Sequence, residues 1–168
     1  LANNNFNLAK LTNINFAGKD LSGSSFHRVE LDGSDMQNTN LNNAEFVQVD
    51  FTKIKNKSLA GADLSEASFA HSNLSGVNLS GAILHTTNFW KADLSGVDFT
   101  VTDVITDGLT FIDANLSNSN FEGVDLSPKE QYFQVFKNKA YLNNLSVIDI
   151  QQDLLLPSQF ILIISTEV

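Results

Sequence analysis

A large apolar residue recurs at every fifth position in the first part of the chain, without a break from Leu1 to Phe51. Two positions before each of these centres there is usually a small or β-branched residue, and Asp, Asn, Glu or Ser is frequent directly before it. The repeating unit is therefore small, polar, large apolar, polar, polar. Its centres in this stretch are Leu1, Phe6, Leu11, Phe16, Leu21, Phe26, Leu31, Met36, Leu41, Phe46 and Phe51.

A period of five excludes the two common secondary structures. An amphipathic helix places apolar residues at spacings of three and four, and a half-buried strand alternates with period two. A chain that turns a corner every five residues satisfies the pattern, because each short face then points one large and one small side chain inward. Four such faces close a coil of about 20 residues, and stacked coils bury a continuous core. The sequence thus predicts an all-β solenoid.

Three segments of the repeat, at residues 62–65, 92–95 and 114–117, are similar to the consensus A(D/N)LXX of the pentapeptide-repeat family. The resemblance covers about three quarters of the chain. It implies a right-handed quadrilateral β-helix, whereas the period by itself specifies only a five-residue solenoid. We expect this β-helix to occupy residues 1–126.

The repeat is interrupted twice. The centres step by eight residues after Phe51 and by seven after Val104. We expect the extra residues to bulge out of the coil within residues 52–58 and around residues 105–110. If each interrupted step still counts as one face, every fourth centre falls in the same column along the axis.

With this count, one column consists only of phenylalanine and the neighbouring column is entirely aliphatic. We predict that they form the core of about six coils, together with two leucines of a third column. Burial of one phenylalanine side chain stabilises a fold by roughly 1.5–3 kcal/mol. The predicted structural residues are Phe6, Phe26, Phe46, Phe69, Phe89 and Phe111, then Leu21, Leu41, Leu64 and Leu84, and finally Leu94 and Leu116.

The five-residue pattern ends after Leu126, where the sequence SPKE at residues 127–130 is typical of a helix start. Ser is a preferred N-cap, Pro is favoured at the first helical position, and Glu three residues after Ser completes a capping box. We expect residues 127–168 to form a short, mainly helical cap. Its apolar run at 160–164 would be a liability if exposed, so the segment packs on its own array, on another subunit or on another domain.

The composition offers little for catalysis or for nucleic-acid binding. Phosphate neutralisation needs clustered Lys and Arg, so the net charge of −9 argues against direct contact with nucleic acid. The chain has no cysteine, and no stretch approaches the roughly 20 apolar residues of a membrane span. His27, His71 and His85 follow their centres on the solvent side, too far apart for a shared metal ion. We predict no catalytic residue, no metal site and no cofactor.

Two surface features are candidate contact sites. Lys53, Lys55 and Lys57 bring three of the ten basic residues into the first interruption, which makes this loop the best candidate for a discrete contact. A solvated charged loop is the competing interpretation. The second feature is rows of acidic residues before the centres, which could imitate duplex DNA, although turn chemistry favours Asp and Asn there for structural reasons. The rows are Asp20, Asp63, Asp103 and Asp125, and Glu30, Asp50 and Asp93.

A scaffold for protein–protein interaction is the function that these features favour most, because repeat rods offer long surfaces and nothing in the sequence organises a reaction. The identity of the protein partner is left open. The start in register at Leu1 and the apolar C-terminal run suggest a fragment of a larger bacterial protein. The family that the sequence resembles includes secreted effectors, some of which carry a separate ubiquitin-ligase domain.

A DNA mimic is the alternative function, because some members of the family bind DNA gyrase or a related topoisomerase and confer quinolone resistance. The acidity and the rod shape agree with it. The nearly uncharged positions before the Phe centres argue against it. An enzyme in its own right and a cyanobacterial repeat protein with another role are further alternatives. The bacterial cytoplasm and secretion into a host cell both agree with the sequence.

Overall fold

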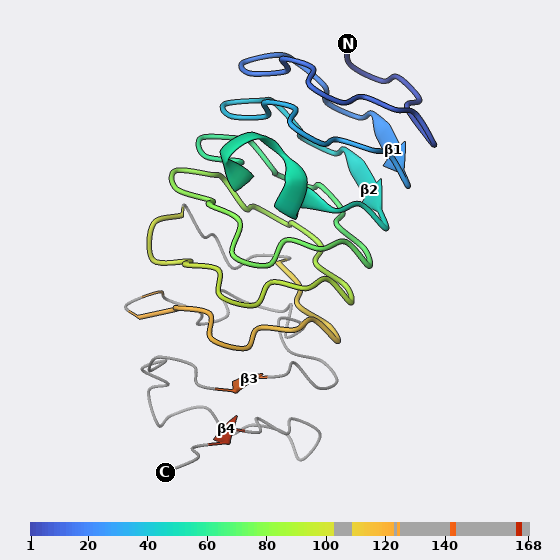
Figure 1. Ribbon diagram of the computed structural model, residues 1–168. Coiled ribbons are helices and arrows are strands. Elements are labelled where there is room, and N and C mark those ends of the chain that lie inside the picture. Colours follow the sequence, from blue (N-terminus) through green and yellow to red (C-terminus); the bar gives the residue numbers. More distant parts are fainter. Residues whose placement is uncertain (103–108, 123, 125–141, 144–163, 166–168) are drawn as a thin grey trace.

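The computed structural model shows a chain that winds into coils stacked along one axis (Figure 1). It describes residues 1–102, 109–122, 124, 142–143 and 164–165. The coils pair through parallel β-bridges, and bridged partners such as Asn15 and Asp35 are usually 20 positions apart in the sequence. The same pairing continues across the first interruption, where Asn40 bridges Asp63. The chain is therefore a solenoid of the β-helix type.

The regular elements are short, because the chain turns again after each face. Much of the pairing consists of isolated bridges, and Phe26 lies opposite Phe46 in a three-residue parallel pair, β1 with β2. β3 and β4 form a second parallel pair. The elements are β1 (Ser25–His27), β2 (Glu45–Val47), the 3₁₀ helices η1 (Phe51–Lys53) and η2 (Lys55–Lys57), β3 (Leu142–Asn143) and β4 (Ile164–Ser165).

Each corner of a coil is a β-turn between two faces. The N–H of the third residue after a centre donates to the carbonyl oxygen of that centre, as Ala62 does to Leu59 at 3.0 Å. The second residue after the centre has positive φ, for example +69° at Gly61, as a type II turn requires. A Cβ at Gly61 would also clash with Asn38 Oδ1. Glycine at this position therefore avoids the backbone cost of the turn and the contact with Asn38, although other residues adopt positive φ at equivalent corners.

The Asp and Asn residues before the centres stabilise the same corners. Their side-chain oxygen accepts a hydrogen bond from the backbone N–H two residues later, from Ser65 to Asp63 at 3.0 Å and from Ser75 to Asn73 at 3.1 Å. These are Asx-turns, in which the side chain replaces a backbone acceptor. The expectation that turn chemistry places Asp and Asn at this position is confirmed.

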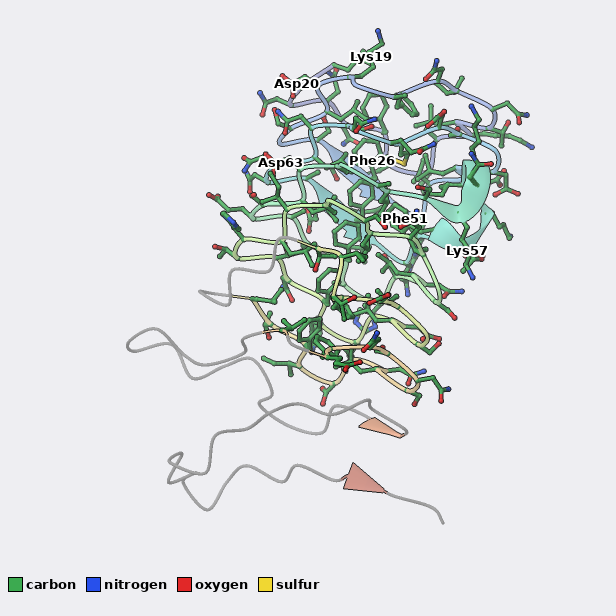
Figure 2. All side chains as sticks on the ribbon, turned by 90° about the vertical axis from the view of Figure 1, so that its left-hand side faces the viewer. Lys19, Asp20, Phe26, Phe51, Lys57 and Asp63 are labelled. Atoms are coloured by element: carbon green, nitrogen blue, oxygen red, sulfur yellow. The ribbon has the colours of Figure 1, made fainter. Side chains whose placement is uncertain are left out.

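The interior is filled by the centres and by the small residues two positions before them. Rings from Phe6 to Phe111 form one stack, with neighbouring centroids 4.6 to 5.5 Å apart and interplanar angles of 6° to 19°. Phe51, labelled with Phe26 in Figure 2, meets Phe69 edge-on at 5.3 Å. Both ring arrangements are favourable. The leucines of the neighbouring columns are buried as well: Leu21, Leu41, Leu64, Leu84, Leu94 and Leu116.

The first interruption does not bulge out as a whole. Ile54, between η1 and η2, is only 4% exposed and lies in the core. The residues on either side of it pair with the preceding coil: Gly33 N–H donates to Lys53 O at 2.8 Å, and Lys55 N–H donates to Ser34 O at 2.9 Å. The expectation that the extra residues are ejected is wrong for Ile54, because burial of its apolar side chain is favourable.

Two expectations concern residues outside the described part of the chain. They are most of the second interruption, at 105–108, and the helix start at 127–130. Leu109 is buried and Thr110 bridges Asn88, so the pairing is in place directly after the second interruption. In the segment 127–168, where the sequence predicts mainly helix, the described residues form strands β3 and β4. None of the described helices has the length and apolar character needed to cross a bilayer.

Candidate functional site

The lysines of the first interruption are partly neutralised by carboxylates. Lys55 Nζ donates to Asp35 Oδ2 at 2.8 Å, and Lys53 Nζ lies 3.7 Å from Asp50 Oδ2. Lys57, labelled in Figure 2, has no ion pair with a described residue. Two of the three lysines therefore serve the structure of the loop first, and Lys57 is the one whose charge is available to a partner.

The pair formed by Lys55 and Asp35 shows the electrostatic effect of this arrangement. The hydrogen bond from Lys55 is the main cause that lowers the pKa of Asp35, followed by a hydrogen bond from the backbone N–H of Gln37. The Asp35 side chain is 13% exposed, whereas that of Lys55 is 54% exposed. The ion pair thus fixes η2 to the coil that precedes it.

The acidic row that begins at Asp20 is interrupted within the described residues by the neutral Asn40. Asp20 and Asp63 lie on the same side of the molecule in Figure 2, with Asn40 bridged to both of them. A hydrogen bond from the backbone N–H of Ser22 is the main cause that lowers the pKa of Asp20, so this carboxylate also belongs to a turn. The remaining members of the predicted row lie outside the described residues: Asp103 and Asp125.

The second acidic row is balanced by lysines and amides. Glu30 lies 3.6 Å from Lys10 Nζ, and Asp50 is the partner of Lys53. Asp93 Oδ1 accepts a hydrogen bond from Asn115 Nδ2 at 3.1 Å. This face presents less free negative charge than its sequence predicts.

The three histidines do not converge. His27 Nε2 lies 3.0 Å from Glu45 Oε2, and the ring of His71 meets that of Trp90 edge-on at 4.8 Å. His85 is half-buried, although the sequence predicts an exposed side chain, and its Nε2 has no hydrogen-bond partner in the described part of the chain. No group of three or more His, Cys, Asp or Glu residues that could hold a metal ion occurs among the described residues.

Trp90 is a surface residue that the sequence reasoning did not single out. Its side chain is 39% exposed, and Lys91 Nζ lies 4.8 Å from the centre of its ring, within the range of a cation–π contact. Exposed tryptophan is enriched among the residues that dominate binding energy in protein interfaces. The sequence does set Trp90 apart, because the residue directly after a centre is small or polar on most of the other faces.

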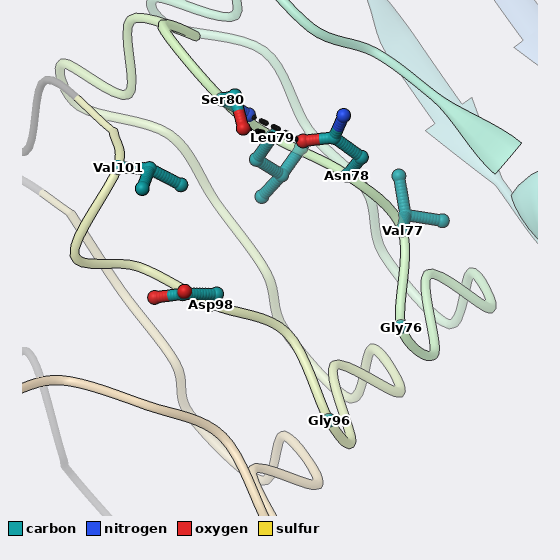
Figure 3. A pocket seen from close by; sticks show the side chains of 8 residues that line it. All are labelled: Gly76, Val77, Asn78, Leu79, Ser80, Gly96, Asp98 and Val101. Carbon is teal, nitrogen blue, oxygen red and sulfur yellow. Dashed lines mark hydrogen bonds between the residues drawn. The ribbon is translucent and has the colours of Figure 1, made fainter.

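A pocket of about 250 Å³ lies between two neighbouring coils (Figure 3). Its polar side chains are already engaged in turns. Asn78 Oδ1 accepts hydrogen bonds from the Ser80 N–H and hydroxyl, and Asp98 Oδ1 does the same for Thr100. The pocket therefore presents no convergent set of free polar groups. It is lined by Gly76, Val77, Asn78, Leu79, Ser80, Gly96, Asp98 and Val101.

Comparison with known families gives a match to the model described as pentapeptide repeats, with eight copies. The matched segments are residues 5–43, 31–53, 62–100 and 107–127, which together make up more than half of the chain. No curated protein sequence matches the chain significantly.

Solved structures similar to this chain include two pentapeptide repeat proteins and one fluoroquinolone resistance protein. HetL of the cyanobacterium Nostoc sp. strain PCC 7120, involved in heterocyst differentiation regulation, is 22% identical over 70% of this chain, with a TM-score of 0.27. The chain spans only 62% of the length of HetL. Rfr23 of the cyanobacterium Cyanothece 51142 is 19% identical, with coverage of 83% and 87% and a TM-score of 0.30. Trypsin-treated QnrB1, a plasmid-mediated fluoroquinolone resistance protein, is 18% identical, with coverage of 83% and 86% and a TM-score of 0.30.

Proposed function

The chain belongs to the pentapeptide-repeat family, and we propose that it is a non-catalytic scaffold that binds a protein partner along the outside of its solenoid. The observation that carries this proposal is the use of positions within each five-residue unit. The centre and the small residue build the interior, and the polar residue before the centre closes the turn. The corner positions are left for recognition, and a stack of coils repeats them along an extended surface.

The lack of a reactive constellation in the described residues supports the non-catalytic part of the proposal. A nucleophile needs an adjacent general base, and a general acid or base needs a cleft that positions its substrate. The polar groups of the pocket serve turns, and the three histidines lie apart.

We further propose that residues 1–126 form a right-handed quadrilateral β-helix of about six coils and that residues 127–168 cap it or pack on another subunit or domain. Support comes from the number of bridged positions within one coil. Four positions of the first coil bridge to the next one at the same spacing. They are Asn5, Lys10, Asn15 and Asp20, with the partners Ser25, Glu30, Asp35 and Asn40.

The same scaffold would serve within a larger bacterial protein, including an effector secreted into a host cell. The intact reading frame tests this part of the proposal. A secretion signal or a catalytic domain with a reactive cysteine is expected elsewhere in that frame. A reading frame with neither would contradict the effector assignment and leave the scaffold assignment in place.

Cross-linking in a lysate of the source organism, followed by calorimetric titration of each recovered protein, tests the scaffold assignment. We expect at least one recovered protein to form a saturable complex of defined stoichiometry with the purified chain. If no recovered protein binds saturably at micromolar concentration, the chain is not a protein-binding scaffold.

A DNA mimic that binds DNA gyrase and confers quinolone resistance is the second candidate. The net charge of −9 favours it, as do Asp20 and Asp63, which have no lysine partner among the described residues. The neutralisation of Glu30 and Asp50 by lysines argues against it. The test is a gyrase supercoiling assay with added protein. Neither inhibition nor protection from a quinolone at micromolar concentration would remove this candidate.

A further inference from the structure

One corner of the solenoid carries large side chains where the other corners carry mostly Gly or Asn. It is the corner that follows the Phe column. At the second residue after the centre, every residue of this row has positive φ, between +53° and +61°. At the other described corners where this position has positive φ, the residue is Gly or Asn, with Glu66 and Thr86 as exceptions. The row consists of Leu8, Arg28, Gln48, His71, Lys91 and Asp113.

The residues of this row adopt a backbone conformation that is unfavourable for most of them. A Cβ atom makes the left-handed region unfavourable, and only Gly, and less often Asn or Asp, adopts it routinely. Backbone strain of this kind concentrates at functional sites, where the side chain is needed for a purpose other than folding. The row therefore points to a role for its side chains on the surface.

An apolar strip runs beside the later part of this row, at the positions directly after the Phe centres from Val47 to Ile112, whereas Asn7 and His27 are polar. Backbone hydrogen bonds between coils align the two rows: Gln48 N–H donates to Ala70 O at 3.1 Å, and His71 N–H donates to Trp90 O at 3.0 Å. Trp90 is exposed, Val47 and Ile112 are half-buried, and Ala70 is nearly covered. The Trp90 corner is defined here as the strip Val47, Ala70, Trp90 and Ile112 with the adjoining residues Arg28, Gln48, His71, Lys91 and Asp113.

The cations of the Trp90 corner have no carboxylate partner among the described residues. Arg28 Nε donates to the neutral Gln48 Oε1 at 2.6 Å, and Lys91 lies against the Trp90 ring. On other parts of the surface, Lys10, Lys53 and Lys55 are paired with carboxylates, whereas Lys19 and Lys57 have no ion pair with a described residue. In a chain with net charge −9, this corner thus combines an apolar surface with two unpaired cations, Arg28 and Lys91, and one carboxylate, Asp113, which forms no ion pair with a described residue.

We propose that the Trp90 corner is the docking surface for an acidic, extended segment of a partner protein. Apolar side chains of that segment cover the strip around Trp90, and its carboxylates pair with Arg28 and Lys91. The apolar contact supplies binding energy, and the charge complementarity selects an acidic sequence. This inference rests on the proposed scaffold function and specifies the surface and the chemistry of the partner.

A second copy of the chain fits this surface less well than an acidic partner does. Three of the carboxylates that another copy could offer are paired with lysines, Glu30 with Lys10, Asp50 with Lys53, and Asp35 with Lys55, and those of Asp20 and Asp63 accept hydrogen bonds within turns. Docking them on the Trp90 corner would break these contacts.

Trp90 provides a direct reporter, because it is the only tryptophan of the chain. The probe is a short peptide in which leucine alternates with aspartate, and the matched control peptide carries lysine in place of aspartate. We expect the acidic peptide to shift the Trp90 emission saturably to shorter wavelength and the lysine peptide to cause no shift. The double variant Arg28→Glu/Lys91→Glu should weaken binding of the acidic peptide by about tenfold or more.

Lys19→Glu, at a residue labelled in Figure 2, is the control variant, because it reverses the charge of an exposed lysine that does not belong to the Trp90 corner. It should bind the acidic peptide like the parent chain. Thermal melting by circular dichroism checks that each variant is folded, and Arg28→Gln/Lys91→Gln replaces the double variant if charge reversal prevents folding.

Three results of these fluorescence measurements would overturn the inference. They are an equal response to the two peptides, an equal loss of affinity in Lys19→Glu, and an emission shift on concentrating the protein alone, which would identify a second copy as the occupant. The scaffold proposal is tested separately by the cross-linked partner. If that partner binds the double variant as tightly as the parent chain, it docks elsewhere, and only the inference on the Trp90 corner fails.

Discussion

The residues of the Phe column and those of the Trp90 corner are constrained by different physical factors, side-chain packing in the column and backbone conformation at the corner. In the column, each ring stacks on the next at 4.6 to 5.5 Å, so packing dictates the residue. At the Trp90 corner the backbone favours Gly or Asn, and yet Arg28, His71 and Lys91 occupy it. We therefore expect substitutions in the column to change stability and substitutions at the corner to change binding of a partner.

The largest expected effect separates the two regions directly. Phe69→Ala should lower the free energy of unfolding by about 3–5 kcal/mol, because it leaves a cavity between Phe46 and Phe89. Trp90→Ala should change it by less than about 1 kcal/mol, since the side chain is exposed. Denaturant unfolding followed by circular dichroism measures both. Equal losses would show that the corner belongs to the folding core.

Ile54→Ala tests whether core packing, which determines the residues of the Phe column, also stabilises the first interruption. We expect a loss of about 2–3 kcal/mol, because Ile54 is buried although it lies outside the five-residue register. Lys53→Ala, next to it but exposed, is the control and should stay within about 0.5 kcal/mol of the parent chain. The same denaturant experiment applies, and a neutral Ile54→Ala would place that residue in a solvated loop.

Two substitutions at residues with positive φ are expected to change stability in opposite directions. Gly61→Ala should destabilise the chain by about 1–2 kcal/mol, because the new Cβ is unfavourable in the left-handed region. Lys91→Gly relieves the same strain and should stabilise by up to about 1 kcal/mol, less the weak contact with Trp90. Melting temperatures of the two variants measure this contrast. A clear loss for Lys91→Gly would mean that Lys91 is there for stability.

The smallest expected effect concerns pH. The folded state holds the pKa of Asp35 below its ordinary value, mainly through Lys55, so the ionised form is favoured by folding. Its contribution is present above the ordinary carboxyl pKa of about 4 and is lost as the pH falls through the lower folded value. Lys55→Met should therefore flatten the decline of stability in acid, whereas Lys91→Met should not. Denaturant midpoints between neutral and acid pH provide the measurement, and identical acid profiles would contradict the pairing.

The sequence predicted the solenoid because each five-residue unit repeats the same turn and the same inward-pointing side chains. It did not predict the burial of Ile54, since a count of centres says nothing about which extra residue turns inward. It also passed over the Trp90 corner. The signal is visible in the printed sequence as a contrast at equivalent positions, where His71 and Lys91 stand at one corner and Gly76 and Gly96 at another. Only the structure relates this contrast to positive φ and to the apolar strip beside it.

The parallel pairing has a mechanical consequence. Each coil is hydrogen-bonded to the coils about 20 residues before and after it, as Asn73 is bridged to Asp50 and to Asp93. A pulling force on one end of the chain would therefore detach one coil at a time. Each detachment would lengthen the molecule by about 60–70 Å, the extended length of a coil less one spacing between strands. Under load the solenoid would therefore extend in steps of similar length, and the coils that are still paired would retain their folded surface.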